Sequence, residues 1–169
     1  TPITAEDVKF TFDTLMEKGS PTYRGYYADV DQVEVESPHS VRFVFKHAGN
    51  RELPLILGQL PVLPKHWWAE HDFSKSNLEV PLGSGPYQVG RVQAGRSIRY
   101  ERVKDWWAKD LPVSRGLYNF DRIRVDYYRD TQVALEAFKA GHFDYWEERI
   151  AKNWATAYDI PAVRDGRII

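Results

Sequence analysis

The sequence predicts an α+β fold built from short strands and helices. Apolar residues recur at helical spacing in two segments, 8–16 and 133–138, and alternate with polar residues in several shorter runs, which is the period of a half-buried strand. Of the 169 residues, 43% are apolar and 28% charged, a composition typical of a soluble globular protein with a substantial core. Cysteine is absent, which excludes disulfides, thiolate metal sites and a cysteine nucleophile.

The first expected element is a helix that begins at Thr4. The Thr4 hydroxyl can cap the first turn, and the carboxylates of Glu6 and Asp7 suit the positive end of the helix dipole. Residues 19–21, with the sequence Gly-Ser-Pro, are expected to end this helix. A tyrosine-rich loop over residues 23–27 is expected to follow.

A β-hairpin is expected next, with its turn at residues 37–40. Val33 and Val35 alternate with polar residues before the turn, and Phe43 and Phe45 lie on one face after it. Two such runs around a short turn indicate an antiparallel pair with one buried face.

The segment after the hairpin is expected to be mainly helical. A short apolar helix is predicted over residues 52–60, and Pro64 suits the first turn of a second helix that runs through Trp68. Residues 72–80 are polar and are expected to form a loop.

The densest run of glycine and proline, residues 81–87, marks an internal boundary and a tight turn that leads the chain into a sheet. The elements expected next are strands over 87–93 and 97–102, a helical turn over 105–107 and a strand over 122–127. A helix over 131–138, ended by Gly141, and a strand over 143–146 are expected to follow. Helical turns are expected near Trp154 and after Pro161.

The sequence contains no motif with the spacing that metal binding, phosphate binding or hydrolysis requires. His66 and His71 lie five residues apart, so that on a helix their side chains point about 140° away from each other, whereas zinc helices use a spacing of four. The Gly83–Gly85 loop precedes a strand instead of opening a helix, and Ser84 lacks the first glycine of a nucleophile elbow. We therefore expect no metal, no cofactor and no enzymatic activity.

Charge gives limited support for a nucleic-acid partner. The net charge is −1, but residues 81–129 contain ten Lys or Arg against five Asp or Glu. Aromatic residues are interleaved there, as single-strand binders require. Arg99, Arg122 and Arg124 alternate with core residues, however, which favours the ordinary solvent face of a sheet, and no apolar run approaches the roughly 20 residues that a membrane helix needs.

The order and spacing of the motifs resemble family 5 of the solute-binding proteins of bacterial ABC importers, the peptide, nickel and opine group. The segments that carry the resemblance are 4–8 with 10–12, 40–43, 64–66, the Gly-Ser-Gly-Pro-Tyr loop at 83–87, Trp106-Trp107, and Gly141 to Asp144. Trp106 stands where the family usually has Tyr, and Val103-Lys104 replaces an expected Asn-Pro. The tryptophan-rich segments and residues 153–156 are most similar to the oligopeptide branch.

The resemblance implies a piece of lobe I of a class II periplasmic-binding-protein fold, with a mixed sheet and flanking helices. Residues 1–80 would belong to the small extra domain of that lobe, and residues 81–169 to its main sheet and the start of the hinge. The chain would be an internal fragment of a periplasmic or lipid-anchored receptor, without membrane insertion of its own. That receptor would hold oligopeptides or similar solutes between two lobes and deliver them to the permease subunits of the importer.

The resemblance also selects candidate ligand-binding residues, because the segment after the Gly141–Asp144 motif runs along the cleft in this family. They are Tyr145, Trp146, Glu147, Glu148 and Arg149, with Tyr23, Tyr26 and Tyr27 as a second set from a loop beside the cleft. The Trp146 ring suits a side-chain pocket, and Glu147 or Glu148 suits a ligand ammonium group. The alternative is that Trp146 is a core residue and both glutamates are solvated.

Two other functions remain as alternatives at this point. A hydrolase domain would require a convergent nucleophile and base, which the sequence does not show. A single-stranded nucleic-acid-binding module would use the basic stretch over residues 81–129.

Overall fold

The computed structural model describes residues 1–75 and 78–169, which form two compact units. The first unit comprises Thr1–Val92 and Arg99–Ile123, and the second comprises Gln93–Ile98 and Arg124–Ile169. Helices and small sheets occur together, so the predicted α+β class is confirmed. No helix within these residues is both long enough and apolar enough to cross a membrane.

The first unit begins with the expected helix, α1 (Ala5–Lys18), which Gly19 ends. The prediction of a tyrosine-rich loop over 23–27 is wrong, because Pro21–Tyr26 forms a helix, α2. The Ser20 hydroxyl accepts a hydrogen bond from the Thr22 N–H group, and Pro21 occupies the first turn, where a proline costs no hydrogen bond.

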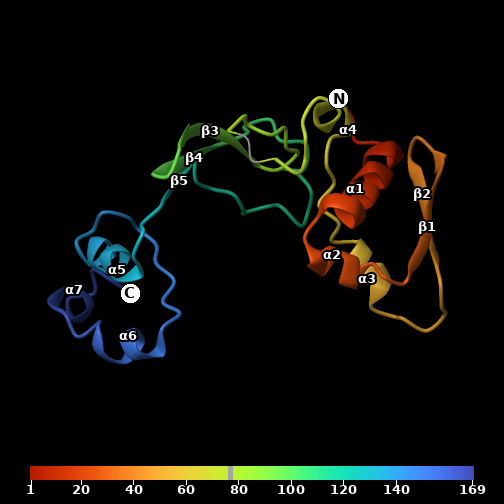
Figure 1. The fold of residues 1–169 in the computed structure, drawn as a ribbon. Coiled ribbons are helices and arrows are strands. Elements are labelled where there is room, and N and C mark those ends of the chain that lie inside the picture. The colour runs from red at the N-terminus through yellow and green to blue at the C-terminus, as the bar shows by residue number, and fades with distance from the viewer. Residues whose placement is uncertain (76–77) are drawn as a thin grey trace. The chain divides into compact units, whose positions relative to one another are not determined.

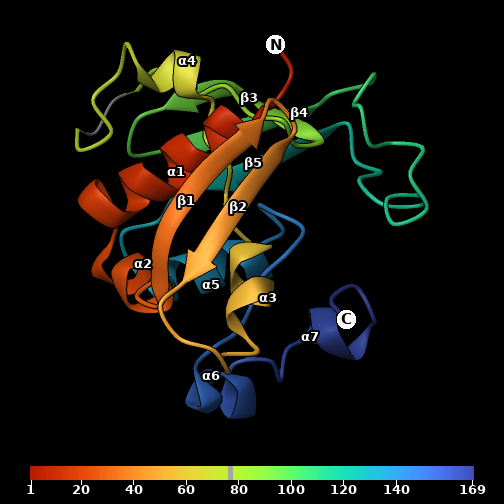
Figure 2. The same cartoon turned by 90° about the vertical axis from the view of Figure 1, so that its right-hand side faces the viewer.

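The predicted hairpin is confirmed as β1 (Val30–Ser37) and β2 (Ser40–Phe45), which pair antiparallel with Val33 opposite Phe43. Figure 2 shows the hairpin lying across α1. The short apolar helix is α3 (Leu53–Leu57), and the helix at Pro64 is α4 (Lys65–Trp68). The core is formed by apolar side chains from α1, α2, the hairpin and α3: Phe12, Tyr27, Val30, Val33, Leu53 and Leu57.

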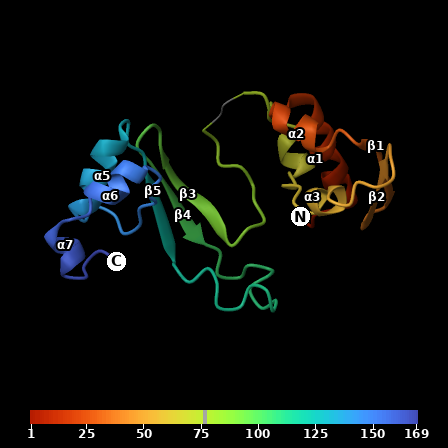
Figure 3. The ribbon, with the colours of Figure 1, turned by 90° about the horizontal axis from the view of Figure 1, so that it is seen from below.

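Three strands follow in the order β3 (Tyr87–Gln93), β4 (Ser97–Arg102) and β5 (Arg122–Asp126), as Figures 1 and 3 show. The Arg102 N–H group donates to the Asp121 carbonyl, and the Tyr127 N–H group donates to the Arg96 carbonyl. This crossed pairing makes β5 antiparallel to β4. The sheets of the described residues are antiparallel, whereas a mixed sheet was expected.

The loop between β4 and β5 contains turns where a helical turn was predicted over 105–107. The reason lies in the side chains of Trp106 and Trp107. Both indole N–H groups donate to the Ser84 carbonyl oxygen, at 2.8 and 2.9 Å. These contacts hold the segment against the Gly-Ser-Gly loop.

The second unit contains α5 (Thr131–Lys139), α6 (Ala151–Thr156) and α7 (Pro161–Arg164). The Asp130 carboxylate accepts a 3.0 Å hydrogen bond from the Val133 N–H group and so caps α5. Gly141 ends this helix region with a φ of 77°, as predicted. The predicted strand over 143–146 is wrong, because this segment has no neighbouring strand within the described residues with which to pair.

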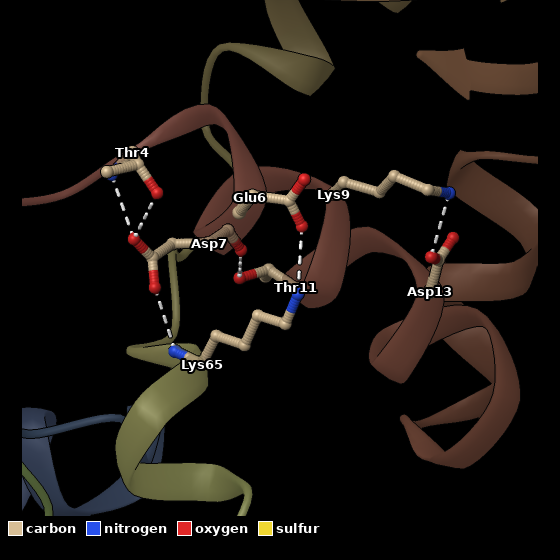
Figure 4. A network of polar contacts seen from close by, with 7 residues as sticks. All are labelled: Thr4, Glu6, Asp7, Lys9, Thr11, Asp13 and Lys65. Carbon is tan, nitrogen blue, oxygen red and sulfur yellow. Dashed lines mark hydrogen bonds and ion pairs between the residues drawn. The ribbon is translucent and has the colours of Figure 1, made fainter. Parts of the chain in front are cut away.

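A buried carboxylate ties the start of α1 to the start of α4 (Figure 4). Asp7 is 8% exposed and accepts hydrogen bonds from the N–H groups of Thr4 and Lys65, both at 2.8 Å, and from the Thr4 hydroxyl at 3.0 Å. The fully buried Thr11 hydroxyl adds a second tie, because it donates to the Asp7 carbonyl and accepts from the Leu63 N–H group. Two segments far apart in sequence are therefore joined through α1.

These bonds also set the protonation of Asp7. Burial by itself raises its pKa, but the hydrogen bonds from Thr4 and Lys65 and the nearby His66 together lower the pKa below its usual value. The carboxylate is therefore the form that the fold stabilises.

Replacing Asp7 tests the contribution of this tie to stability. We expect Asp7→Asn to lower the free energy of unfolding by about 1–3 kcal/mol, because it weakens three hydrogen bonds to a buried charged acceptor. The matched control is Asp13→Asn, which removes an exposed pair with Lys9 and should cost less than about 0.5 kcal/mol. Urea unfolding measures both, and equal costs for the two variants would contradict this assignment.

The pH dependence of the same variant provides a second test. The pKa of Asp7 is lower in the folded chain than the value of about 3.9 typical of an unfolded one. Its stabilising contribution is therefore fully present above the unfolded pKa and is lost as the pH falls through the folded pKa. The difference in unfolding free energy between the wild type and Asp7→Asn should shrink as the pH is lowered below about 4; a difference that stays constant would argue against the charge as its source.

Candidate functional site

The segment that carries the predicted site, residues 145–149, lies between α5 and α6 in the second unit. Trp146 is half-buried at one end of an aromatic cluster, with its ring centroid 6.2 Å from that of Phe143. Phe143 in turn contacts Tyr128 and Phe138 at 5.9 and 5.6 Å. The Trp146 ring therefore packs against other aromatic residues of this unit, as expected of a core residue, but it is only partly buried.

Glu148 is the polar centre of this segment. Its Oε2 accepts hydrogen bonds from the Tyr158 hydroxyl at 3.1 Å and from the Trp146 indole N–H group at 3.4 Å. Its Oε1 accepts the Ile150 N–H group at 2.8 Å, directly before α6 begins. One carboxylate thus holds two rings and the entry of a helix.

The protonation of this network follows from the same contacts. Desolvation raises the pKa of Glu148, but the hydrogen bonds from Ile150, Trp146 and Tyr158 lower it by more, so that the net pKa lies below its usual value. Desolvation and the bond to the Glu148 carboxylate raise the pKa of Tyr158. Glu148 is therefore a carboxylate at neutral pH, and Tyr158 is its hydrogen-bond donor.

Glu147 and Arg149 differ from Glu148 in being exposed to solvent. They form an ion pair with each other, in which Arg149 Nη2 lies 2.8 Å from Glu147 Oε2. The bond from Arg149 lowers the pKa of Glu147. This pair presents one negative and one positive group that a ligand can approach.

Two large rings near this segment are open to solvent. The Tyr145 side chain is 79% exposed, and the Trp154 side chain, on α6, is 72% exposed. Trp154 also contacts the ring of Tyr158 at 5.7 Å. Sequence reasoning did not select Trp154 or Tyr158 as site residues; Tyr158 lies just beyond the end of α6.

The second set of predicted residues lies in the first unit, and the structure separates its three members. Tyr27 is 2% exposed and packs on Phe12 in the core at 5.5 Å, so it has no surface to offer a ligand. Tyr23 is half-buried and stacks on Tyr27 at 6.1 Å. Tyr26 is 57% exposed and is the accessible ring of the three.

Metal-ligating side chains do not gather in groups of three or more anywhere in residues 1–75 and 78–169. The His71 ring nitrogens are both engaged, because Nδ1 lies 2.7 Å from the Trp67 carbonyl oxygen and Nε2 lies 2.7 Å from Glu79 Oε2. His71 also stacks on Trp67 at 3.7 Å. Its role here is to fix the end of α4.

The basic stretch over residues 81–129 is partly neutralised by its own acidic residues. Arg99 pairs with Glu101 at 3.0 Å, Arg102 with Asp121 at 2.6 Å, and Arg124 with Asp126 at 2.8 Å. These contacts support the interpretation of the alternating arginines as a solvated face.

Comparison with known proteins places these features in a family. The family model described as "Bacterial extracellular solute-binding proteins, family 5 Middle" matches residues 1–167. YejA of Escherichia coli K12, which is named as uncharacterized, is 48% identical over 157 residues that cover 93% of this chain. YejA of Agrobacterium fabrum, named "Probable peptide-binding protein", is 41% identical over 174 residues that cover 99% of it.

The chain spans 26% and 28% of the lengths of these two relatives. Among solved structures, the oligopeptide-binding protein AppA of Bacillus subtilis, in complex with a nonapeptide, aligns with a TM-score of 0.73 and 22% identity. The alignment covers 95% of this chain and 32% of AppA. This likeness confirms the predicted class of fold.

The Glu148 network predicts a measurable effect on local backbone protection. We expect Glu148→Ala to accelerate amide hydrogen exchange at Ile150 by about tenfold, since a hydrogen bond to a charged acceptor contributes about 1.5 kcal/mol. Glu147→Ala, which removes a neighbouring exposed carboxylate, should leave that amide unchanged. Exchange followed by NMR would show equal rates in both variants if Glu148 did not anchor α6.

Proposed function

Because the chain belongs to family 5 of the bacterial extracellular solute-binding proteins, we propose that it is part of the receptor of an ABC importer. The observation that carries this proposal is the match of the family model to residues 1–167, nearly the whole chain. The receptor holds oligopeptides or similar solutes between two lobes and delivers them to the permease subunits. Its place is the periplasm, or the outer face of the membrane if it carries a lipid anchor.

The proposed mechanism is closure of the two lobes around the ligand. Residues 1–80 contribute to the small extra domain of the first lobe, and residues 81–169 to its main sheet and the start of the hinge. A ligand that contacts both lobes shifts the equilibrium towards the closed state by its difference in affinity for the two states. Residues 1–169 alone therefore supply only part of the contacts that closure creates.

Within this chain, the proposed ligand contacts lie at residues 145–149 and on α6. The exposed rings of Tyr145 and Trp154 are suited to the apolar side chains of a peptide. The Glu147–Arg149 pair is suited to charged groups on the ligand, because each partner can exchange the other for a ligand group. Glu148 positions Trp146 instead of meeting the ligand directly, since three donors already occupy its oxygens.

The proposed role is binding without chemical conversion of the solute. The family and the structures that resemble the chain are binding proteins. Neither alternative gains from the geometry, because three arginines of the basic stretch are paired within the chain and no observation favours a hydrolytic pair.

Calorimetry with a library of synthetic tri- to pentapeptides tests the proposed function. We expect the full-length receptor to bind at least one member, and residues 1–169 alone to bind it at least about 100-fold more weakly, because the contacts of the second lobe are missing. Tight binding by residues 1–169 would refute the division of the site between two lobes. Hydrolysis of the peptides, followed by mass spectrometry, would refute the non-enzymatic role.

Alanine variants of the exposed rings test the site. Trp154→Ala and Tyr145→Ala should each weaken peptide binding by the full-length receptor about five- to thirtyfold, the cost of one aromatic contact of about 1–2 kcal/mol. The control is Phe120→Ala, because Phe120 is 73% exposed and lies in the other unit. If all three variants bind equally well, residues 145–158 do not contact the ligand.

A further inference from the structure

A concave site lies in the first unit, formed by the end of β4 and the long loop that precedes β5. The pocket has a volume of about 220 Å³, and its lining includes Val103, Lys104, Trp106, Lys109, Ser114 and Tyr118. All of these residues belong to one unit, so the pocket is formed within it. It shares no residue with the segment over 145–158 proposed above to contact a peptide.

The charged residues that line this pocket are all basic. Its ionisable chains other than tyrosine are Arg102, Lys104 and Lys109, and no carboxylate of the described residues is part of the lining. Arg102 is compensated by Asp121 at 2.6 Å. In contrast, neither lysine has an ion-pair partner within residues 1–75 and 78–169. Two uncompensated ammonium groups at one small cavity favour an anionic occupant.

The lining of the pocket also contains a serine hydroxyl. Ser114 is only 8% exposed, and across the described part of the chain its hydroxyl makes no hydrogen bond. Because Ser114 lines the pocket, a ligand oxygen in the pocket can accept its proton in a hydrogen bond.

The lining also contains two aromatic residues, one of which has an unfavourable backbone conformation. The rings of Trp106 and Tyr118 meet edge to face with centroids 5.2 Å apart. The Trp106 indole N–H group is already bonded to the Ser84 carbonyl, so this ring offers apolar surface and not a donor. Tyr118 has a φ of 58°, a left-handed conformation that is unfavourable for a tyrosine and that clusters at functional sites.

From these observations we propose that the pocket binds a small organic anion, specifically a carboxylate carried on a planar apolar body. The carboxylate lies between the Lys104 and Lys109 ammonium groups and accepts a hydrogen bond from the Ser114 hydroxyl. The planar body lies against Trp106 and Tyr118. The site is separate from the proposed peptide contacts, and its occupation does not depend on the transport function.

Three small probes that differ in one property each test this proposal. Benzoate has both the charge and the ring, benzamide lacks the charge, and acetate lacks the ring. We expect benzoate to bind the full chain with a Kd of about 1 mM, and benzamide and acetate to bind at least about tenfold more weakly. NMR titration should shift the signals of Trp106, Ser114 and Tyr118, and added salt should weaken benzoate but not benzamide.

Variants assign the contacts. The double variant Lys104→Gln/Lys109→Gln should lose about tenfold or more in benzoate affinity, and Ser114→Ala about three- to tenfold. Lys152→Gln is the matched control, because it removes an exposed lysine from the other unit. Benzamide binding as tightly as benzoate, shifts confined to other residues, or unchanged affinity in the double variant would each overturn the proposal. The probe comparison uses the unaltered protein, so it holds even if a variant fails to fold.

Discussion

The carboxylate of Asp7 is the contact on which the first unit depends most. A charge that is largely removed from water is tolerated only when hydrogen bonds replace its hydration, and here three donors do so. Two of the donors belong to Thr4, so the same carboxylate caps α1 and receives the first residue of α4. One carboxylate therefore both caps α1 and bonds to a backbone group 58 residues away in sequence.

The Gly-Ser-Gly loop and the tryptophan pair are likewise joined through a single acceptor. The Ser84 carbonyl oxygen accepts both indole N–H groups and so ties this loop to the tryptophan pair. The Tyr87 hydroxyl continues the pattern by donating to the Phe120 carbonyl at 2.8 Å. The segments by which the family is recognised thus serve largely to hold the framework, and the candidate ligand contacts lie elsewhere.

The sequence predicted elements well where the signal is local and poorly where it depends on distant partners. Strands 87–93 and 97–102 and the caps at Thr4, Asp130 and Gly141 follow from periodicity and from residue chemistry. The segment over 143–146 has a strand-like sequence, but a strand requires a neighbour, which residue order does not supply. Burial is equally non-local: Tyr27 and Tyr26 are adjacent, yet one is in the core and the other is exposed. The bond between Glu148 and Tyr158 spans ten residues and could not be anticipated from spacing alone.

The two neighbouring glutamates of the candidate site show how one segment combines rigidity with exchangeable charge. Glu148 is held by three donors, so moving it would leave two rings and a helix entry without their acceptor. Glu147 is bound only by the exposed Arg149, and such surface pairs contribute about 0–1 kcal/mol. In the site proposed above, replacing one partner of the Glu147–Arg149 pair by a ligand group therefore costs little free energy, whereas replacing a partner of Glu148 costs more. In the receptor proposed above, Glu148 keeps this segment in place, and the exposed Glu147–Arg149 pair is the part that meets the charges of the ligand.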